Sequence, residues 1–472
     1  MSGYLLLKKQ YLLRGWKGMK HGVTDTVSGG TLFLPGNVYD TLRLCNGRFE
    51  GDSPIFIGQR KEHLKVFLEH GLVEELDTPG TLLPVQEYME YGNRYIEMVH
   101  WSMTGLCNYR CRHCYMSAPK AVFPKPDTKE CRRIIDEMAS CGIRLVSLTG
   151  GEVLTREDFL TLIDYMLEKG LRIVTVMSNG ALVNEKLLTE LEKRNCKPIF
   201  NISFDGTEGW HDWLRGVNGA EKAVEKAFLL CREHGFPLES GFCLHKGNAG
   251  TLRDSVRKLG EWGVSTLKVS RLCISGEASG IVDKAISNKE EYDIYMDYIP
   301  HYIKDGMPVK NIMLSGAFGC MDGEAFIPFV KGDDESPDDS AFVCRAARLT
   351  MYIGPDGRIL PCIPMSETEK SQEYFPSISG MTLEEALTDS SYLSFIRTDM
   401  GQYLEVNPGC ESCEYKYRCG GGCRGRAVID NGGEDLLSPD PDACLFFKSG
   451  YYDRVKNLIN GFKRNKAFWR MK

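Results

Sequence analysis

The sequence of 472 residues contains no apolar run that approaches the roughly 20 residues needed to span a membrane. A secretion signal is not expected, because Lys8 and Lys9 follow the N-terminal apolar patch instead of preceding it and no small-residue cleavage site is evident. The formal net charge of −6 argues against general affinity for nucleic acid. We therefore expect a soluble, cytoplasmic protein with neither a membrane nor a nucleic acid as partner.

The 18 cysteines are also too few for a disulfide scaffold, since they make up roughly 4% of the chain and such scaffolds contain roughly 8–10%. In a reducing compartment, clustered thiols indicate ligands of a metal or redox cofactor. Eight cysteines lie outside the clusters and are expected to pack as small apolar side chains. These are Cys45, Cys131, Cys141, Cys196, Cys231, Cys243, Cys273 and Cys320.

Between about residues 96 and 315, apolar strand-like runs alternate with amphipathic helical patterns, which predicts an α/β unit with a parallel sheet wrapped by helices. Six such repeats indicate a partial (β/α)6 barrel of the TIM type, with its ligand site at the C-terminal ends of the strands. The predicted strands are residues 96–104, 144–150, 171–178, 199–205, 238–245 and 266–272. The predicted helices lie near residues 127–141, 156–169, 184–195, 219–234 and 249–262, and Asp127 with Glu130 provides a cap signal for the first.

The pattern changes on either side of this unit, which suggests five parts. Residues 1–92 resemble a small winged-helix fold, residues 93–315 form the barrel, and residues 316–343 are a bridging region. Residues 344–450 are loop-rich and dense in cysteine, and residues 451–472 are predicted to form a basic helix. The acidic stretch at 331–340 is expected to be a solvated surface loop.

Cys107, Cys111 and Cys114 place three thiols in the loop after the first predicted strand. Three thiolates can bind zinc if a fourth ligand joins them, and His113 is the nearest candidate. They can equally hold three irons of a cubane cluster and leave the fourth iron open to a ligand that is not protein. The spacing alone leaves both possibilities open.

The surroundings of this loop resemble the radical S-adenosylmethionine (radical SAM) enzymes. Those enzymes carry CxxxCxxC followed by an aromatic residue, here Tyr115, in the loop after the first strand of a six-unit βα domain, and SAM chelates the open iron. Gly150, Gly151 and Glu152 match the GGE(P) motif that holds the SAM ammonium, although Val153 replaces the usual proline.

The resemblance also implies cofactor-binding residues at the later strand ends. The third strand ends in a segment similar to the ribose contact of the family, the fourth ends in short polar residues, and residues 211–216 match a common HDxxRG stretch. An arginine at the end of the sixth strand holds the SAM carboxylate in family members, but the resemblance does not say which arginine does so here. The implied residues are Ser178, Asn179, Ser203, Asp205, Arg215 and Arg271.

The C-terminal cysteines resemble the SPASM extension of radical SAM enzymes, C…GxxxxC…CxxCxxxxxCxxxC…C, which carries two auxiliary clusters. By this resemblance, the outer cluster would be bound by Cys410, Cys413, Cys419 and Cys444, and the inner cluster by Cys344, Cys362 and Cys423. Cys320 and an open iron are both candidates to complete the inner cluster. A pair of four-thiolate zinc knuckles would need eight cysteines, whereas this pattern has seven.

The resemblance implies an enzyme that contains three [4Fe–4S] clusters and cleaves SAM to a 5′-deoxyadenosyl radical, which abstracts hydrogen from an unactivated carbon. It also implies an electron donor such as ferredoxin or flavodoxin. SPASM members mostly act on peptides, and residues 4–76 resemble, more weakly, a leader-peptide recognition domain whose sheet edge accepts the leader as an extra strand. Alternatively, this unit merely covers the barrel.

We therefore expect a maturase of a ribosomal precursor peptide that links a cysteine sulfur to a carbon, of the ranthipeptide or sactipeptide type. A substrate thiolate on an open inner iron would lie beside the substrate radical. Carbon–carbon (cyclophane) cross-linking is the nearest alternative. A formylglycine-forming sulfatase activator is a further one, although Ile363 stands where that group has Asp. A non-catalytic iron-sulfur or zinc scaffold that binds peptides would make the SAM-contacting elements accidental.

Overall fold

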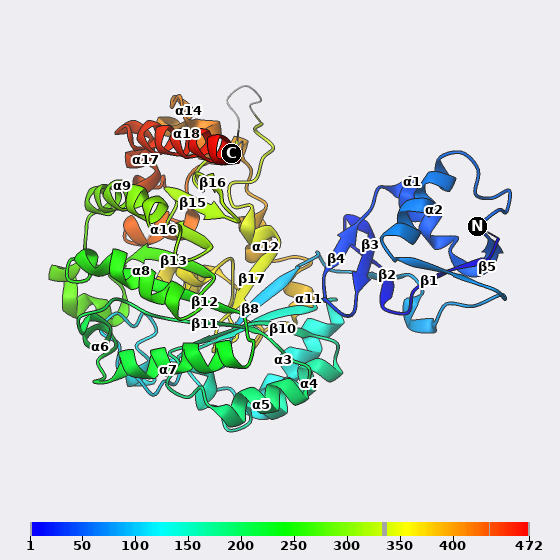
Figure 1. Cartoon of the computed structure of the whole chain (residues 1–472), viewed down its shortest axis with the longest axis horizontal. Coiled ribbons are helices and arrows are strands. Elements are labelled where there is room, and N and C mark those ends of the chain that lie inside the picture. Colours follow the sequence, from blue (N-terminus) through cyan, green and yellow to red (C-terminus); the bar gives the residue numbers. More distant parts are fainter. Residues whose placement is uncertain (1, 333–337, 434, 471–472) are drawn as a thin grey trace.

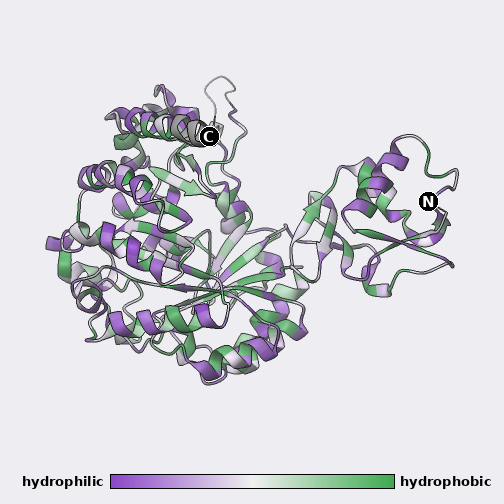
Figure 2. Ribbon diagram, in the orientation of Figure 1, coloured by the Kyte–Doolittle hydropathy of each residue, from purple (hydrophilic) through white to green (hydrophobic). Residues whose placement is uncertain are grey.

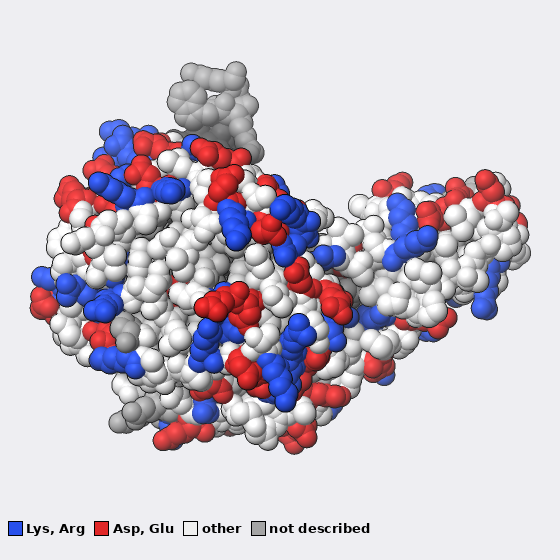
Figure 3. Space-filling view, turned by 90° about the horizontal axis from the view of Figure 1, so that it is seen from below, with Lys and Arg blue, Asp and Glu red and all other residues white. Residues whose placement is uncertain are grey.

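The computed structural model describes residues 2–332, 338–433 and 435–470. A large α/β unit forms most of the molecule, and an N-terminal lobe protrudes from it (Figure 1). The acidic stretch predicted as a surface loop falls partly on residues 333–337, which lie outside the described residues. None of the described helices is both long and apolar enough to cross a membrane. The face in Figure 3 carries side chains of both charges interspersed.

An 11-stranded sheet forms the centre of the α/β unit, in the order β16-β15-β14-β13-β12-β11-β10-β9-β8-β17-β18. The six predicted strands are all present and run parallel to their neighbours, so the predicted partial barrel is confirmed. They are β8 (Met98–Ser102), β9 (Leu145–Thr149), β10 (Arg172–Ser178), β11 (Ile199–Ile202), β12 (Leu238–Leu244) and β13 (Thr266–Arg271).

The predicted helices follow these strands and cover the outer face of the sheet (Figure 1). They are α3 (Thr128–Ser140), α4 (Phe159–Glu168), α5 (Glu185–Lys193), α7 (Ala220–Glu233) and α8 (Leu252–Glu261). As predicted, the side chain of Asp127 caps α3 and accepts a hydrogen bond of 2.7 Å from the backbone N–H of Glu130. Buried apolar residues of strands and helices form one core between these layers. The ribbon of the outer helices carries many hydrophilic residues (Figure 2).

Several elements of the sheet were not predicted. A seventh parallel strand, β14 (Asn311–Leu314), is followed by the antiparallel strands β15 (Phe318–Met321) and β16 (Glu324–Phe326). On the opposite side, β17 (Thr350–Ile353) pairs in parallel with β8, with Tyr352 opposite His100, and β18 (Ile359–Leu360) extends the sheet further. The part of the chain expected to be loop-rich therefore adds two strands to the barrel sheet.

The C-terminal part is otherwise built from short helices. These are α10 (Glu369–Tyr374), α11 (Leu383–Ala386), α12 (Ser391–Ile396), α13 (Met400–Glu405), α14 (Pro408–Glu411), α15 (Lys416–Cys419), α16 (Arg424–Asp430) and α17 (Pro441–Lys448). The long helix α18 (Tyr451–Arg470) follows, and it packs against α9 (Asn288–Lys304) and α17.

The N-terminal lobe contains two small sheets. One has the order β5 (Asn46–Glu50), β1 (Tyr4–Leu7), β6 (Val73–Leu76) and shares an apolar core with α1 (Gly36–Arg43) and α2 (Gln59–Glu69). The other has the order β4 (Thr31–Phe33), β3 (Met19–Asp25), β2 (Tyr11–Trp16), β7 (Met89–Tyr91). The likeness of this lobe to a winged helix stays a prediction.

The second sheet attaches the lobe to the N-terminal ends of the barrel strands. The indole N–H of Trp16 donates to the carbonyl of Cys141, just before β9, at 3.1 Å. At the start of β10, the Arg172 guanidinium donates to the carbonyl of Thr26 at 2.7 Å. The lobe is therefore docked at the end of the barrel opposite the loop with the three cysteines.

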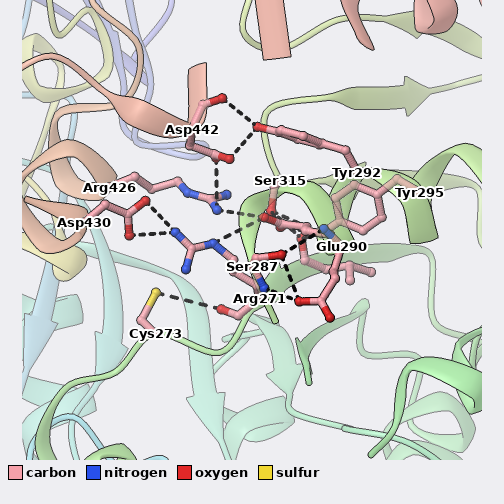
Figure 4. A network of polar contacts seen from close by, with 12 residues as sticks. Arg271, Cys273, Ser287, Glu290, Tyr292, Tyr295, Ser315, Arg426, Asp430 and Asp442 are labelled. Atoms are coloured by element: carbon pink, nitrogen blue, oxygen red, sulfur yellow. Dashed lines mark hydrogen bonds and ion pairs between the residues drawn. The ribbon is translucent and has the colours of Figure 1, made fainter. Parts of the chain in front are cut away.

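A network of buried charges joins the barrel to the C-terminal helices (Figure 4). At its centre, the carboxylate of Glu291 on α9 is fully buried and pairs with Arg426 of α16 at 2.8 Å and with Arg271 of β13 at 3.4 Å. Arg426 also pairs with Asp442 of α17 at 3.0 Å, and Arg271 with Asp430 of α16. Opposite charges alternate through the network, so each buried ion has a counter-ion.

We expect the Glu291→Gln variant to lose roughly 3 kcal/mol of stability, because removing one partner of a buried ion pair leaves the others uncompensated. Chemical unfolding would report this as a lower midpoint. Asp297→Asn, which removes an exposed carboxylate from the same helix, serves as the control and should leave the midpoint unchanged. Equal midpoints for the two variants would show that Glu291 is not needed to hold the units together.

Candidate functional site

The loop that carries Cys107, Cys111 and Cys114 follows β8 at the C-terminal end of the barrel. Its backbone turns back on itself, with the N–H of Cys114 bonded to the carbonyl of Cys111 at 3.2 Å. The three side chains are half-buried, and the thiol of Cys107 lies close enough to the other two to interact with them electrostatically. The structure therefore brings the three predicted thiols together.

A donor group points at each of these sulfur atoms. The N–H of Tyr109 lies 3.4 Å from the Cys107 sulfur, the N–H of Ala118 lies 3.4 Å from the Cys114 sulfur, and Nη1 of Arg215 lies 3.9 Å from the Cys111 sulfur. Burial raises the pKa of the Cys107 thiol to about 12, so it carries a proton at neutral pH unless a metal displaces it. Donors in these positions stabilise thiolates once they have formed.

The glycine pair that follows β9 lies directly against the cysteine loop. The N–H of Gly151 donates to the carbonyl of Thr104 at 2.8 Å, and the N–H of Glu152 donates to the carbonyl of Leu106 at 2.9 Å. A Cβ atom on Gly151 would overlap the Leu106 carbonyl. Gly150 and Gly151 are thus needed for the close approach of two backbone segments, in addition to the SAM contact that the resemblance implies.

The carboxylate of Glu152 is buried and holds the end of β10. It accepts hydrogen bonds from Ser178 Oγ at 3.0 Å, the N–H of Asn179 at 2.7 Å and the N–H of Leu154 at 3.1 Å. Burial raises its pKa, which the hydrogen bonds oppose. Ser203 lies beside this point, since its N–H reaches the carbonyl of Ser178 at 3.4 Å. The contacts of Glu152, Ser178 and Ser203 with SAM stay predictions.

Asn179 links the end of β10 to the cysteine loop. Its Nδ2 donates to Oδ1 of Asn108 at 2.8 Å and lies 3.8 Å from the sulfur of Cys107. The carboxamide oxygen of Asn179 accepts from the N–H of Ala181 at 3.0 Å, which fixes the orientation of the side chain. The role of Asn108 was missed from the sequence, because nothing local shows that it faces a strand end 71 residues away.

A buried ion pair supports the other side of the loop. Nε of Arg215 donates to Asp205 at 2.7 Å, and Asp205 also accepts from the N–H of Cys243 at 2.9 Å. Although burial opposes ionisation, the Arg215 guanidinium holds the pKa of Asp205 well below its usual range. Gly216 comes next with a φ of +67°, and a Cβ there would overlap the carbonyl of Arg110 in the loop. Asp205 and Arg215 therefore position the loop around Cys111.

Arg271, which the resemblance implies near SAM at the end of the sixth predicted strand, makes ion pairs in this structure, and its contact with SAM stays a prediction. Its guanidinium donates to Asp430 at 2.6 Å and faces Glu291, inside the network that joins the units (Figure 4). Both partners neutralise it, and Asp430 belongs to a helix 159 positions away that the sequence pattern did not place there. The segment after β13 touches the loop by another route, because the N–H of Glu277 donates to the carbonyl of Cys114 at 3.0 Å.

Polar residues on the inner face of the barrel strands lie between the cysteine loop and the C-terminal unit. Lys268 of β13 is exposed, and its charge acts on both His100 of β8 and Cys362. Burial and this cation lower the pKa of His100. Tyr115, directly after the third loop cysteine, lines a pocket together with Tyr352 of β17. Alternation of His100 with Val99 and Trp101 was the sequence signal for these inward positions.

The four cysteines of the predicted outer set line one pocket. The thiols of Cys419 and Cys444 each interact electrostatically with that of Cys410, and Cys444 also interacts with Cys413. Asp440 supports this arrangement, because its carboxylate caps α17, which carries Cys444, and also accepts from the N–H of Cys423 at 2.7 Å.

The three cysteines of the predicted inner set also lie together. The charge of Cys362 interacts with Cys344 and Cys423, and Cys362 follows β18 at the edge of the barrel sheet. Cys320, proposed as a fourth ligand, is buried on β15 and contacts the hydroxyl of Tyr302 on α9 instead. A donor for the fourth position would have to come from another group.

Among residues 2–332, 338–433 and 435–470, no three His, Cys, Asp or Glu side chains converge as ligands of a single metal ion. The fit of iron-sulfur clusters is therefore judged by donor chemistry. Sets of three and four neighbouring thiols, with N–H groups or a guanidinium directed at the loop sulfurs, suit cubane clusters held by thiolates. The ligand role of each cysteine stays a prediction.

Two protein-family models match the parts of the chain that contain these sites. Residues 101–259 match the Radical SAM superfamily, and residues 344–414 match SPASM, an iron-sulfur cluster-binding domain. The first match contains the cysteine loop and the strand ends around it. The second contains two cysteines of the inner set and two of the outer set.

Similar proteins span most of the chain. Fe-coproporphyrin III synthase of Methanosarcina barkeri is 25% identical over 75% of this chain and 90% of its own length. PqqA peptide cyclase of Gluconobacter oxydans is 25% identical over 76% of this chain and 92% of its own length. The crystal structure of Streptococcus suis SuiB bound to S-adenosylmethionine aligns with a TM-score of 0.61 at 16% identity, over 93% of this chain and 99% of SuiB. That likeness shows a shared fold.

We expect the Gly151→Ala variant to lose the iron held by the cysteine loop, because the added methyl group displaces the backbone at Leu106 next to Cys107. Overpacking of this kind also costs roughly 1–3 kcal/mol of stability. Iron analysis and thermal unfolding measure the two effects. In the control Gly250→Ala, the methyl group enters open space and should change neither. Full iron content in Gly151→Ala would contradict the proposed packing.

Proposed function

This chain is a radical SAM enzyme with a C-terminal SPASM domain, and from that premise we propose that it joins a cysteine sulfur to a carbon, as a thioether, in a ribosomally made precursor peptide. The observation that carries the proposal is the parallel pairing of β17 with β8. This pairing sets the inner cysteine set beside the barrel whose mouth carries the loop of three thiols. Both sites can therefore face one bound peptide.

Cys107, Cys111 and Cys114 would hold the cluster that binds SAM, with Tyr115, Gly150, Gly151, Glu152, Ser178, Asn179 and Ser203 around the cofactor. Cys344, Cys362 and Cys423 would hold the inner auxiliary cluster, and Cys410, Cys413, Cys419 and Cys444 the outer one. With SAM and an electron from a donor such as ferredoxin or flavodoxin, the first site supplies a 5′-deoxyadenosyl radical that removes a hydrogen atom from a carbon.

The residues of the chain fix the positions at which this chemistry takes place. Asn179 and Arg215 hold the two sides of the cysteine loop, so its sulfur atoms cannot move independently of the strand ends. Tyr115 and Tyr352 line one pocket together, between the cysteine loop and β17. Lys268 and His100 provide polar groups on the inner wall, between the mouth and the inner thiols.

The N-terminal lobe supports a peptide as the substrate. Alignment of 93% of this chain with SuiB requires that most of this lobe has a counterpart in that fold, and SuiB has been crystallised bound to the precursor peptide SuiA. The sheet β5-β1-β6 ends in two edge strands, to which an extended leader could add by backbone hydrogen bonds. Because the lobe docks at the far end of the barrel, a leader bound there leaves the mouth free for the core peptide.

The inner site favours a thioether over the alternatives. Three thiols gather there, and Cys320 is directed to Tyr302. A thiolate of the substrate peptide would then be the fourth sulfur donor of this set. Carbon–carbon cross-linking remains the second candidate, since a relative named as a peptide cyclase is 25% identical to this chain and a cyclase can close a peptide without a sulfur.

Replacing Cys107, Cys111 and Cys114 together by alanine should abolish formation of 5′-deoxyadenosine from SAM in the reduced protein, because no thiol of that loop remains to bind iron. Iron at the auxiliary sites should be retained, since none of their cysteines is changed. Chromatography of 5′-deoxyadenosine and iron analysis measure both results. The control is Cys196→Ala, a buried cysteine outside the sites. Persistent 5′-deoxyadenosine in the triple variant would refute the assignment of the loop.

The bond formed can be tested if a short open reading frame beside the gene encodes a cysteine-containing peptide, which is then used as the substrate. Each thioether should remove two hydrogen atoms and protect one cysteine from alkylation, and mass spectrometry detects both changes. Loss of two hydrogens with every cysteine still open to alkylation would indicate a carbon–carbon link. An unchanged peptide, together with conversion of a porphyrin substrate, would refute peptide modification.

A further inference from the structure

Lys331 lies in the segment that follows β16 and is inserted between the two groups of C-terminal cysteines. Its backbone N–H donates to the carbonyl of Arg418 at 2.8 Å, which fixes the segment against α15. Its ammonium group donates to the carbonyls of Val343 at 3.1 Å and Gly420 at 3.3 Å, and also to the carbonyl of Gly422. The three donors of the ammonium group are thereby all used.

The three carbonyls belong to residues that adjoin predicted ligands of both clusters. Val343 precedes Cys344 and Gly422 precedes Cys423, which are in the inner set, whereas Gly420 follows Cys419 of the outer set. The loop from Cys419 to Cys423 thus supplies one thiol to each set, and Lys331 is bonded to that loop twice.

The electrostatic surroundings of the ammonium group also connect it with both cysteine sets. The thiols of Cys344, Cys423 and Cys419 lie close enough to interact with it electrostatically, as does the guanidinium of Arg424, and the thiols become negative charges when they bind iron as thiolates. Burial lowers the pKa of Lys331, because carbonyl dipoles only partly replace the water that an ammonium ion loses. A half-buried cation of this kind is stable when anions lie close to it.

We propose that Lys331 is a positioning residue that links the two auxiliary clusters electrostatically and raises the reduction potential of both. The proposal rests on the ligand sets assigned under Proposed function. A cluster held by thiolates becomes more negative when it accepts an electron, so a nearby positive charge stabilises the reduced form relative to the oxidised form. Because one ammonium group serves both sites, its removal should affect both potentials.

The test uses the anaerobically reconstituted full chain with Cys107, Cys111 and Cys114 replaced by alanine, so that only the auxiliary clusters give signals. Redox titration followed by electron paramagnetic resonance gives the two midpoint potentials. Lys331→Gln keeps an amide donor but removes the charge, and Lys331→Met removes both. We expect full iron content and more negative potentials for both clusters in Lys331→Gln, and recovery toward the unchanged potentials in Lys331→Arg.

Lys448→Gln is the matched control, because Lys448 acts on Cys444 of the outer set and is exposed. It should shift the outer potential alone, and by less. Unchanged potentials in iron-loaded Lys331→Gln, or a shift of one cluster only, would overturn the proposal. Loss of iron from Lys331→Gln would show a merely structural role and overturn it as well. Absence of auxiliary iron even with Lys331 intact would instead refute the ligand assignment, and the proposal with it.

Discussion

Everything the active site does depends on holding one loop of three thiols still at the mouth of the barrel. The loop has little regular structure of its own, so its geometry comes from hydrogen bonds to neighbouring strand ends. The backbone at Gly151 and Glu152 binds one stretch of it, Asn179 binds Asn108, and Arg215 reaches the sulfur of Cys111. These residues follow three different strands of a parallel sheet, whose C-terminal ends meet at the same edge. The fold thus creates the site by bringing together residues that are separated in the chain.

A second constraint is that the C-terminal unit, which carries the other two cysteine sets, must be fixed to the barrel. Strand pairing of β17 with β8 meets this requirement on one side of the barrel, and the buried network around Glu291 meets it on the other. The two connections differ in kind. Backbone hydrogen bonds fix the register of β17 on the sheet, whereas the ion pairs are specific to the side chains that meet. Together they leave the C-terminal unit little freedom to move relative to the barrel.

The sequence predicted those features that arise from local patterns. The six strands and their helices follow from alternating and helical periodicity, the cap at Asp127 from its own residue type, and the cysteine groups from their spacing. The features that the sequence did not predict depend on contacts between segments far apart in the chain. Pairing of β17 with β8 joins segments about 250 residues apart, and the ion-pair partner of Arg271, Asp430, lies 159 positions further along the chain. For Glu152, the residue was predicted correctly as part of the mouth, but its bonds to the end of β10 require knowledge of how two loops pack.

Buried charges in this protein are compensated in two different ways. Asp205 with Arg215, and Glu291 with its two arginines, are neutralised by side chains within the polypeptide. Lys331 is surrounded by carbonyl dipoles and thiols, which carry no negative charge while they are protonated. Since the cost of burying an ammonium ion falls when anions are adjacent, iron binding that converts these thiols to thiolates would stabilise Lys331 in place. Folding of the C-terminal unit and loading of its clusters should therefore be coupled.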